Sequence, residues 1–337
     1  MFKWVKDLGG TVNAEVKLNK DGVRGLFTTK GIKRDEPICS IPAAAIMNVA
    51  GYNDSFAVPT LAVLKEWKLG AQSRFKPYVD MWPGPEGLVN SCNMDLKYVP
   101  MWKNDYCESS GRERNHADWH KHAMALLDGS LNPDIEYTVQ EVMGADPVTV
   151  DDLKYACAIS STRYVSSARR RRLLMAPVFD LANHDRNCAN YLSAYDTADF
   201  LHLLAGEDMA ANTEVCYSYG ALRDDYALAH YGFMPPLEDP PRLAYVDHPE
   251  FSEGHYSHDN APSEEPFQGT PEEMRRELQR LKGIRVQIKN TPDALPPQPK
   301  GQDYVYDMLK ELEWRRLNAL EYEIKRLAFA LNEKVEL

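Results

Sequence analysis

An apolar run that stops abruptly at polar residues constrains this chain more than any other stretch. Residues 173–179 read Leu-Leu-Met-Ala-Pro-Val-Phe, which has the length and composition of a buried strand with one proline kink. Asp180, Asn183 and His184 follow where the chain should still be inside the protein. Buried polar groups that lack partners cost about 1–3 kcal/mol each. These side chains therefore either hold a turn together or bind a ligand.

Two further motifs follow downstream of this run. Residues 213–220 alternate like a half-buried strand and end in a Tyr219-Gly220 pair. Residues 231–233 then read Tyr-Gly-Phe. Taken one at a time, His184 is best explained as a hydrogen-bonded turn histidine, and the aromatic residues as ordinary core side chains. Only the three motifs together, in this order, indicate a shared site.

These motifs resemble the catalytic half of SET-domain methyltransferases, in particular the subgroup typified by the Rubisco large-subunit lysine methyltransferase. That subgroup has Asp-x-x-Asn-His at a strand end, then Tyr-Gly-x-x-x-Asn with two leucines, then Tyr-Gly-Phe. Residues 180–184, 219–220 and 231–233 match these three pieces at the family spacing. The usual asparagine is replaced by Asp224, and the leucine pair reads Ala-Leu at residues 227–228.

The resemblance implies an α+β chain, in which a SET fold of small β-sheets with a threaded C-terminal segment carries a helical insert and a helical C-terminal domain. We expect the N-terminal part of the SET domain at residues 1–50 and a mostly helical insert at 51–159. The catalytic part should occupy 160–234, and the helical domain, which resembles a substrate-binding domain, should occupy 235–337.

The resemblance also implies a site for S-adenosyl-L-methionine, the methyl donor. In the family a glycine turn passes backbone groups along the donor, an arginine lies near its carboxylate, and the Asn-His pair holds its adenine and amino-acid portions. The corresponding residues are Gly22, Val23, Arg24, Arg163, Asn183 and His184. Val23 stands where the family has the first glycine of Gly-x-Gly-Leu.

Substrate contacts are implied for four further residues. By position these are Asp180, Tyr195, Tyr231 and Phe233. Tyr231 and Phe233 would form an aromatic wall of the substrate site. The electron-rich faces of aromatic rings favour binding of an alkylammonium by about 0.5–2 kcal/mol. Asp180 would either contact the substrate or brace its turn.

Tyr219 is the expected catalytic residue. Methyl transfer to nitrogen is an in-line displacement that requires a neutral nucleophile, alignment and exclusion of water, and we expect no metal. We expect the Tyr219 hydroxyl to orient the amine and accept weak C–H···O contacts from the methyl group. A phenol with a pKa near 10 is poorly matched to a general base.

The expected reaction is methylation of a protein side chain, with the ε-amine of lysine in a non-histone protein as the acceptor. A protein histidine is an alternative acceptor, since imidazole is already neutral near pH 7. An alternative of another class is an interaction module that retained the fold and lost turnover. Val23 and Asp224 favour that alternative, and Ser167 replaces a family arginine.

Local signals predict several elements outside the motifs. Residues 149–152, Thr-Val-Asp-Asp, form a capping box that opens a helix. Thr270-Pro271-Glu272-Glu273 combines an N-cap with proline at the first helical position. Apolar spacing predicts a last helix over about 302–331. Prolines predict an edge strand at 36–42, and residues 73–78 resemble the Ser-x-x-x-Pro-Tyr segment of the family insert.

Composition limits the partners. The net charge of −11 disfavours a nucleic-acid backbone and suits a basic protein substrate. No apolar run approaches the roughly 18–20 residues needed to span a bilayer, and the N-terminus lacks the apolar core of a secretory signal. We therefore expect a protein substrate, no nucleic acid, no membrane and a monomer.

The six cysteines show no Cys-x-x-Cys pair. Scattered cysteines in a chain of this size predict reduced thiols in an intracellular, reducing compartment. The cytoplasm and the plastid stroma both fit, and the sequence does not choose between them. The zinc-binding cysteine cluster that follows the tyrosine motif in many histone-directed SET enzymes is absent from the sequence.

Overall fold

The computed structural model describes residues 1–20, 22–51, 57–103, 123–127, 147–167, 171–193, 199–220, 222–246 and 267–334. The chain forms two compact units, each assembled from stretches that are distant in sequence. The first unit comprises Met1–Leu88 and His120–Tyr219. The second comprises Val89–Trp119 and Gly220–Leu337. The α+β fold class predicted from the sequence is confirmed.

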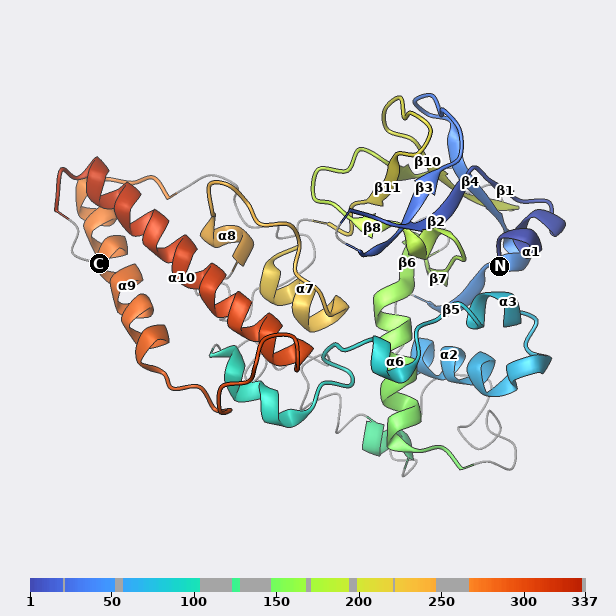
Figure 1. Ribbon diagram of the computed structural model, residues 1–337, viewed down its shortest axis with the longest axis horizontal. Helices are drawn as coiled ribbons and strands as arrows, with labels where there is room; N and C mark the ends of the chain where they lie inside the picture. The colour runs from blue at the N-terminus through green and yellow to red at the C-terminus, as the bar shows by residue number, and fades with distance from the viewer. Residues whose placement is uncertain are drawn as a thin grey trace. The chain divides into compact units, whose positions relative to one another are not determined.

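The described residues of the first unit form three small sheets (Figure 1). One sheet has the order β1 (Thr11–Val12), β4 (Pro37–Pro42), β10 (Phe200–Leu204), β9 (Tyr191–Leu192). The second has the order β2 (Ala14–Leu18), β3 (Arg24–Thr28), β11 (Glu214–Tyr217), β8 (Asn183–His184). The third has the order β5 (Met47–Gly51), β7 (Arg172–Met175), β6 (Tyr164–Ser167).

Strand β4 is central in its sheet, so the prediction of an edge strand was wrong. It pairs antiparallel with β1 on one side and with β10 on the other. Pro37 and Pro42 occupy its first and last positions, so the residues between them keep their N–H groups for the ladder. Ile38, Cys39 and Ile41 are buried and form part of the core.

All three sheets and the N-terminal helix α1 (Phe2–Asp7) share one apolar core. Its buried members include Val5, Leu26, Ile38, Leu174, Leu203 and Val215. Most strands here are short, so their stability comes from this common core and not from any single sheet.

The described part of the insert contains helices, short 3-10 turns and irregular stretches. Helix α2 (Ala57–Leu69) packs against α6 (Val150–Arg163), and α3 (Lys76–Val79) lies nearby in sequence. Helix α6 begins at the predicted capping box. The Thr149 hydroxyl accepts from the Asp152 N–H at 3.1 Å, and the Asp152 carboxylate accepts from the Thr149 N–H at 2.9 Å. Short 3-10 turns occupy Ala43–Ala45, Gly70–Gln72, Pro85–Gly87 and Phe179–Leu181.

The second unit is built from helices. These are a 3-10 segment η4 (Leu96–Trp102) and α7 (Asp224–Tyr231), α8 (Leu243–Val246), α9 (Pro271–Asn290) and α10 (Tyr304–Ala330). Helix α9 begins at the predicted Thr270 cap, with Glu273 completing the capping box. Helix α10 confirms the predicted last helix and is about 40 Å long. Leu278, Leu281, Ile324 and Leu327 are buried together between α9 and α10.

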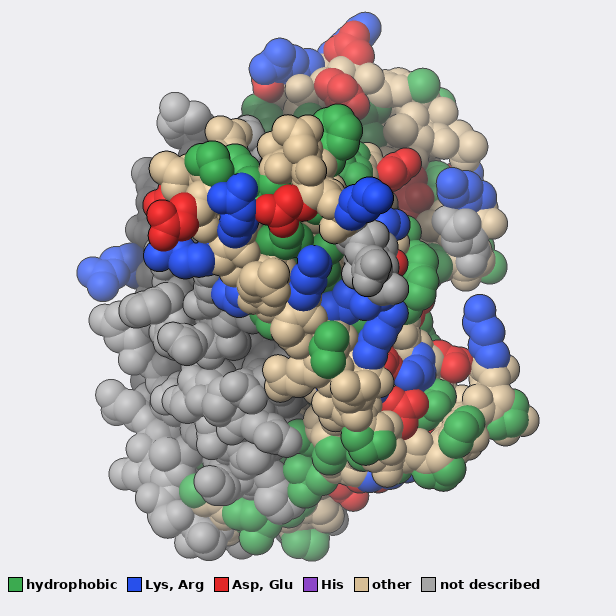
Figure 2. Space-filling model, turned by 90° about the vertical axis from the view of Figure 1, so that its left-hand side faces the viewer, with side chains coloured by type: hydrophobic (Ala, Val, Ile, Leu, Met, Phe, Trp, Pro, Cys, Tyr) green, Lys and Arg blue, Asp and Glu red, His purple; other side chains and the backbone are tan. Residues whose placement is uncertain are grey.

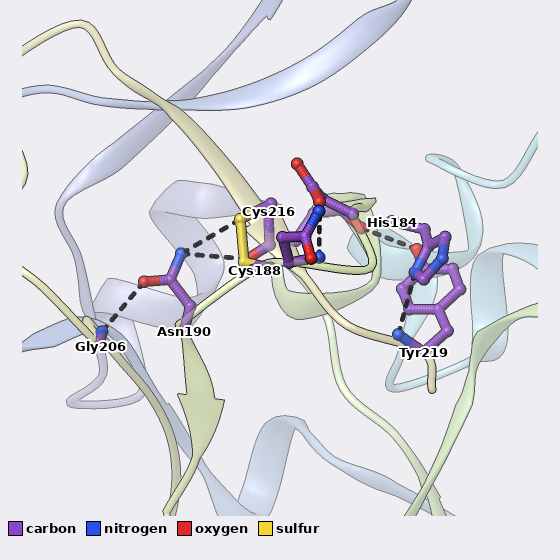
Figure 3. The surroundings of a disulfide bond; sticks show 9 residues. His184, Cys188, Asn190, Gly206, Cys216 and Tyr219 are labelled. Atoms are coloured by element: carbon purple, nitrogen blue, oxygen red, sulfur yellow. Dashed lines mark hydrogen bonds between the residues drawn. A yellow bond between two sulfur atoms is a disulfide. The ribbon is translucent and has the colours of Figure 1, made fainter. Parts of the chain in front are cut away.

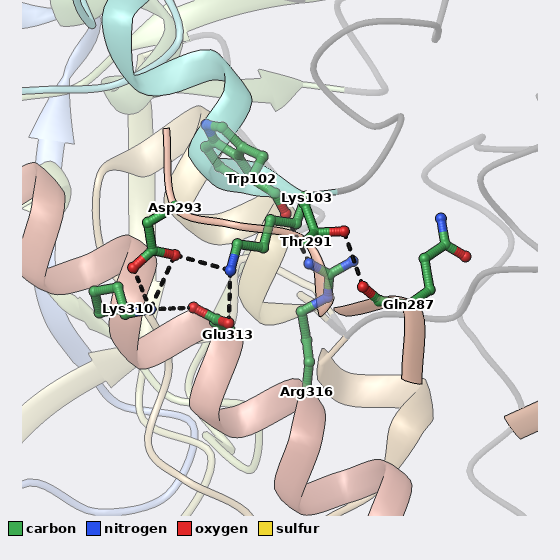
Figure 4. Close-up of polar contacts among 8 residues, drawn as sticks. All are labelled: Trp102, Lys103, Gln287, Thr291, Asp293, Lys310, Glu313 and Arg316. Atoms are coloured by element: carbon green, nitrogen blue, oxygen red, sulfur yellow. Dashed lines mark hydrogen bonds and ion pairs between the residues drawn. The ribbon is translucent and has the colours of Figure 1, made fainter. Parts of the chain in front are cut away.

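A buried lysine links η4 to α10 within the second unit (Figure 4). The Lys103 Nζ lies 2.8 Å from both Asp293 Oδ1 and Glu313 Oε1, and its side chain is 4% exposed. Lys310 joins the same two carboxylates. Although burial by itself would raise the pKa of Asp293, hydrogen bonds from the two lysines hold that pKa below its ordinary value. Asp293 therefore stays charged near neutral pH.

Basic side chains of α9 are held by acidic partners. Arg280 pairs with Glu277 at 2.6 Å, and Arg285 pairs with Glu321 on α10 at 2.7 Å. Figure 2 shows one face of the molecule, on which Lys and Arg side chains are spread among acidic and hydrophobic ones. Partly buried pairs near the surface contribute about 0–1 kcal/mol each. Of these two pairs, Arg285–Glu321 alone joins α9 to α10, so packing is the main cause of the association of the two helices.

Within the described ranges, none of the helices is long and apolar enough to cross a lipid bilayer.

Candidate active site

Two chain segments that are distant in sequence meet at the centre of the first unit (Figure 3). Strand β8 pairs parallel with β11, which places Asn183 opposite Cys216 and His184 opposite Tyr217. The Tyr219 N–H donates to His184 Nδ1 at 3.1 Å. The Tyr219 hydroxyl donates to the Ala182 carbonyl at 2.7 Å. The Asn-His motif and the tyrosine motif are therefore parts of one site.

Asn183 ties β8 to the glycine turn. Its Nδ2 donates to the Arg24 carbonyl at 3.0 Å and to Glu214 Oε1 at 2.9 Å. A Cβ at Gly25 would lie 2.5 Å from Glu214 Oε1 and 3.2 Å from Asn183 Nδ2. A larger residue at this position would force the ends of the Glu214 and Asn183 side chains to move. Gly25 was not predicted to belong to the site, although it occupies the place of the second glycine in the family's Gly-x-Gly-Leu turn.

The turn before β3 is closed by its own hydrogen bonds. Gly22 has φ +76° and donates its N–H to the Asn19 carbonyl at 3.0 Å. The Val23 N–H donates to Asn19 Oδ1 at 3.0 Å, and Val23 is exposed. The exposed Val23 thus closes the turn, since its carbonyl also accepts the Asn19 N–H at 2.8 Å, and Arg24 begins β3. A valine side chain is tolerated there because it points to solvent.

Asp180 is buried against two residues from the insert. Its side chain is 3% exposed, and Oδ2 accepts from the Tyr78 hydroxyl at 2.9 Å. Arg163 Nε, at the end of α6, lies 3.5 Å from the same oxygen. Burial raises the pKa of Asp180, and the charge of Arg163 opposes that rise. Arg163 and Asp180, expected to bind donor and substrate, therefore belong to one cluster.

The apolar run before Asp180 does not continue as a strand, and that prediction was wrong in its extent. Strand β7 ends at Met175. Val178 has φ +71° and is fully buried. A β-branched residue in that conformation is strained by about 1–3 kcal/mol. The strained turn begins the 3-10 segment Phe179–Leu181 that carries Asp180, so strain is stored next to the site.

Burial sets the charge state of both central side chains. Burial, reinforced by the charge of Asp180, raises the pKa of Tyr219 to about 12. Burial lowers the pKa of His184 to about 4, and Arg186 adds to that effect. Tyr219 is therefore a neutral phenol and His184 a neutral imidazole near pH 7. The neutral His184 can accept the Tyr219 N–H at Nδ1 because no proton occupies that atom.

We expect the stability of the protein to fall between pH 6.5 and 4 because of His184. Its folded pKa of about 4 lies below the ordinary 6.5, so the unfolded chain binds the proton first. Stability present above pH 6.5 is lost as the pH falls towards 4, by about 1 kcal/mol per pH unit after allowance for partial exposure. His184→Asn keeps an acceptor and does not titrate. Urea unfolding across this range should show a flatter profile for the variant, and identical profiles would contradict this origin.

Cys188 and Cys216 form a disulfide beside the paired strands β8 and β11 (Figure 3). Cys92 and Cys157 are also disulfide-bonded, so the prediction of reduced thiols was wrong for these four cysteines. The Cα atoms of Cys188 and Cys216 lie 5.9 Å apart although 28 residues separate them in sequence. Parallel pairing of β8 with β11 brings them together, and no cysteine spacing motif signals it. Asn190 Nδ2 also donates to the Cys216 carbonyl at 3.1 Å. Cys39 is a buried free thiol.

Replacing Cys188 and Cys216 together by serine should lower the free energy of unfolding by about 3.5 kcal/mol. The disulfide closes a chain loop of 28 residues, and a loop of that size loses about this much entropy in the unfolded state. Urea denaturation of the wild type and of the double variant measures the difference. An unchanged urea midpoint would show that the disulfide adds nothing to the stability of the protein.

The aromatic motif of residues 231–233 lies in the second unit. The Tyr231 and Phe233 rings have centroids 6.1 Å apart. Gly232 ends α7 with φ +76°, and a Cβ there would lie 2.1 Å from the Val89 carbonyl oxygen. The positive φ and the close Val89 carbonyl therefore explain why residue 232 is a glycine. Tyr195, the remaining expected substrate residue, lies outside the residues that the structure describes.

Asp224, which replaces the family asparagine, has a structural partner in its own unit. Its carboxylate accepts from Arg315 Nη1 at 3.0 Å, and both side chains are buried. Arg315 also donates to the Pro235 carbonyl at 2.8 Å. Removing one member of a buried ion pair leaves an unpaired charge and is strongly destabilising. The replacement of the family asparagine by Asp224 is thus explained by its ion pair with Arg315 of α10.

Among the described residues, no group of three or more His, Cys, Asp or Glu side chains is arranged to hold a metal ion.

The family pattern of the SET domain matches residues 23–220. This match covers more than half of the chain, and the chain belongs to the SET domain family. Solved structures with a similar fold include the SET domain of LSMT bound to MeLysine and AdoHcy, with a TM-score of 0.59 at 15% identity. The aligned part covers 98% of this chain and 91% of that one.

A second similar structure is Rubisco LSMT bound to AdoMet, with a TM-score of 0.58 at 15% identity. It covers 98% of this chain and 91% of that chain. The expected SET fold, with its helical C-terminal part, is confirmed by these similarities. No curated protein matches the sequence.

Proposed function

We propose that the protein is a methyltransferase that transfers a methyl group from S-adenosyl-L-methionine to the ε-amine of lysine in a non-histone protein. The observation that carries this proposal is the meeting of His184 with Tyr219, 35 residues apart in sequence, through a hydrogen bond of 3.1 Å. The similar LSMT structures hold AdoHcy with methyllysine or with lysine. Their fold is shared with this chain, and their ligands support the same reaction here.

The charges of the site fit the methyl donor. Its amino-acid part carries a carboxylate and an ammonium, and it also has a sulfonium. Arg163 offers a guanidinium to the carboxylate, and Asp180 keeps a buried oxygen, Oδ1, without a partner among the described residues. Asn183, His184 and the backbone of residues 22–24 complete the proposed donor site. These groups match a zwitterion in a way that an apolar core would not.

The donor supplies an electrophilic methyl group on sulfur. Tyr219 holds the amine nitrogen in line with that methyl and accepts weak C–H···O contacts from it. The phenol pKa of about 12 keeps Tyr219 protonated, so the proton of the incoming ammonium passes to water instead. The buried carboxylate of Asp180 is the anionic group of this site, and it is available to an ammonium of the donor or of the substrate.

Labelling with a tritiated methyl donor tests this proposal. The purified protein is incubated with a cell extract, and the labelled band is analysed by mass spectrometry. Methyl-lysine in a non-histone protein is the expected result. Detection of methyl-histidine instead would identify histidine as the acceptor. AdoHcy binding without any label would indicate an interaction module that has lost turnover. Absence of AdoHcy binding would end the proposal.

A further inference from the structure

The two oxygens of the Asp180 carboxylate are held in different ways. Oδ2 accepts the Tyr78 hydroxyl at 2.9 Å and lies 3.5 Å from Arg163 Nε. Oδ1 is buried and has no hydrogen-bond partner among the residues that the structure describes. An acceptor buried without a partner is costly. An oxygen kept in that state next to Arg163, in a proposed donor site, indicates a place for a ligand N–H.

Tyr78 reaches Asp180 from the insert, 102 residues away in sequence. Its side chain is 1% exposed, and its ring packs edge-on against Trp82 with centroids 5.5 Å apart. It lies in α3, which has Pro77 in its first turn. A ring packed in this way cannot change rotamer freely. The hydroxyl is therefore a fixed point against which the carboxylate of Asp180 is oriented.

We propose that Tyr78 is a positioning residue that holds Asp180 in one orientation, so that Oδ1 accepts an ammonium group in the active site. The ammonium belongs either to the amino-acid part of the methyl donor or to the substrate lysine. Tyr78 touches neither molecule and acts through Asp180. This inference rests on the proposed function, because that reaction supplies the cationic groups.

The charged and titratable groups around Asp180 come from four elements. Arg163 lies on α6, Arg24 on β3, Tyr78 on α3, and Tyr219 just after β11. Burial raises the pKa of Asp180, whereas the charge of Arg163, the Tyr78 hydrogen bond, the charge of Arg24 and the backbone N–H of Asp180 itself lower it. Loss of the Tyr78 hydroxyl removes one of the four effects that favour the carboxylate. The pKa of Asp180 then rises, and its anionic form is lost at a higher pH.

The test compares Tyr78→Phe with Tyr155→Phe as a matched control. The Tyr155 hydroxyl also makes one hydrogen bond in the first unit, to the Pro83 carbonyl at 2.9 Å, and its side chain is 5% exposed. Each variant therefore loses one buried hydroxyl, and we expect similar falls in melting temperature. Only Tyr78→Phe should alter ligand binding at Asp180.

Calorimetry from pH 5 to 8 measures the dissociation constants of AdoHcy and of free lysine added to AdoHcy-saturated protein. We expect Tyr78→Phe to raise one of these two dissociation constants about tenfold at pH 7. The pH below which binding of that ligand weakens should also rise by about one pH unit. Weaker AdoHcy binding would assign the ammonium to the donor. Weaker lysine binding alone would assign it to the substrate. Tyr155→Phe should leave both constants and both pH profiles unchanged.

An Asp180→Asn background shows whether Tyr78 acts through this carboxylate. In that background the Tyr78→Phe change should have no further effect on either ligand. The inference is overturned if Tyr78→Phe binds both ligands as Tyr155→Phe does, or if its effect persists fully with Asp180→Asn. If wild-type protein binds no AdoHcy, the proposed function fails and this inference fails with it. Normal wild-type binding with an unaffected Tyr78→Phe variant overturns the inference alone.

Discussion

Replacing Tyr219 with phenylalanine should lower the rate of methyl transfer about 100-fold or more, while AdoHcy affinity changes by less than about fivefold. The hydroxyl is the group proposed to hold the amine in line, and its loss removes that interaction together with the hydrogen bond to the Ala182 carbonyl. The ring of Tyr219 would keep its packing against His184, with centroids 5.2 Å apart, so the donor site should persist. Initial rates with tritiated donor and calorimetry with AdoHcy measure the two effects separately.

Tyr217→Phe is the matched control for this substitution. Tyr217 lies on β11, two residues before Tyr219, and its ring packs edge-on against Phe179 at 4.8 Å. Removing its hydroxyl should leave the rate within about twofold of wild type, because no role in transfer is proposed for it. An unchanged rate in Tyr219→Phe would remove Tyr219 from the mechanism. Equal losses in both variants would point to general loosening of β11.

Helix starts were predictable from the sequence because their causes are local. The capping boxes at Thr149 and Thr270 each involve residues three apart in the chain, and the structure shows both. The last helix follows from its apolar spacing and ends at Ala330. Such signals do not depend on tertiary packing, so one sequence suffices to recognise them.

The centre of the site was predictable for a different reason. Asn183, His184 and Tyr219 were grouped by the order of motifs in a resembled family, and the parallel pairing of β8 with β11 brings them into contact. Nothing local in either segment specifies that pairing. Arg163 and Asp180 were each assigned to the site, but their ion pair was not predicted.

The remaining features depend on tertiary packing. The bond from Tyr78 to Asp180, the approach of Gly25 to Asn183 and the Cys188–Cys216 disulfide all join residues far apart in sequence. Residue type alone does not reveal such partners, since any buried tyrosine or cysteine could serve. The central position of β4 was missed because its prolines stand at the two strand ends, where pairing tolerates them.

Gly206→Ala should destabilise the first unit by about 3 kcal/mol or more, and AdoHcy affinity should fall with stability. A Cβ at this position would lie 1.9 Å from the Ala189 carbonyl oxygen, so two backbone segments would have to separate. The Gly206 N–H also donates to Asn190 Oδ1 at 3.1 Å, and Asn190 donates to the Cys216 carbonyl. The displacement would therefore reach β11, the strand that leads to Tyr219.

Gly31→Ala separates this steric effect from the general cost of changing a glycine. A Cβ at Gly31 would meet only the Met209 carbonyl oxygen, at an ordinary contact distance of 3.8 Å. We expect its urea midpoint and its AdoHcy affinity to stay close to wild type, because no atom has to move. If Gly206→Ala unfolds at the same urea concentration as Gly31→Ala, then the Ala189 segment can shift without loss of stability. The contact between residues 189 and 206 would then have no part in holding β11 in place for Tyr219.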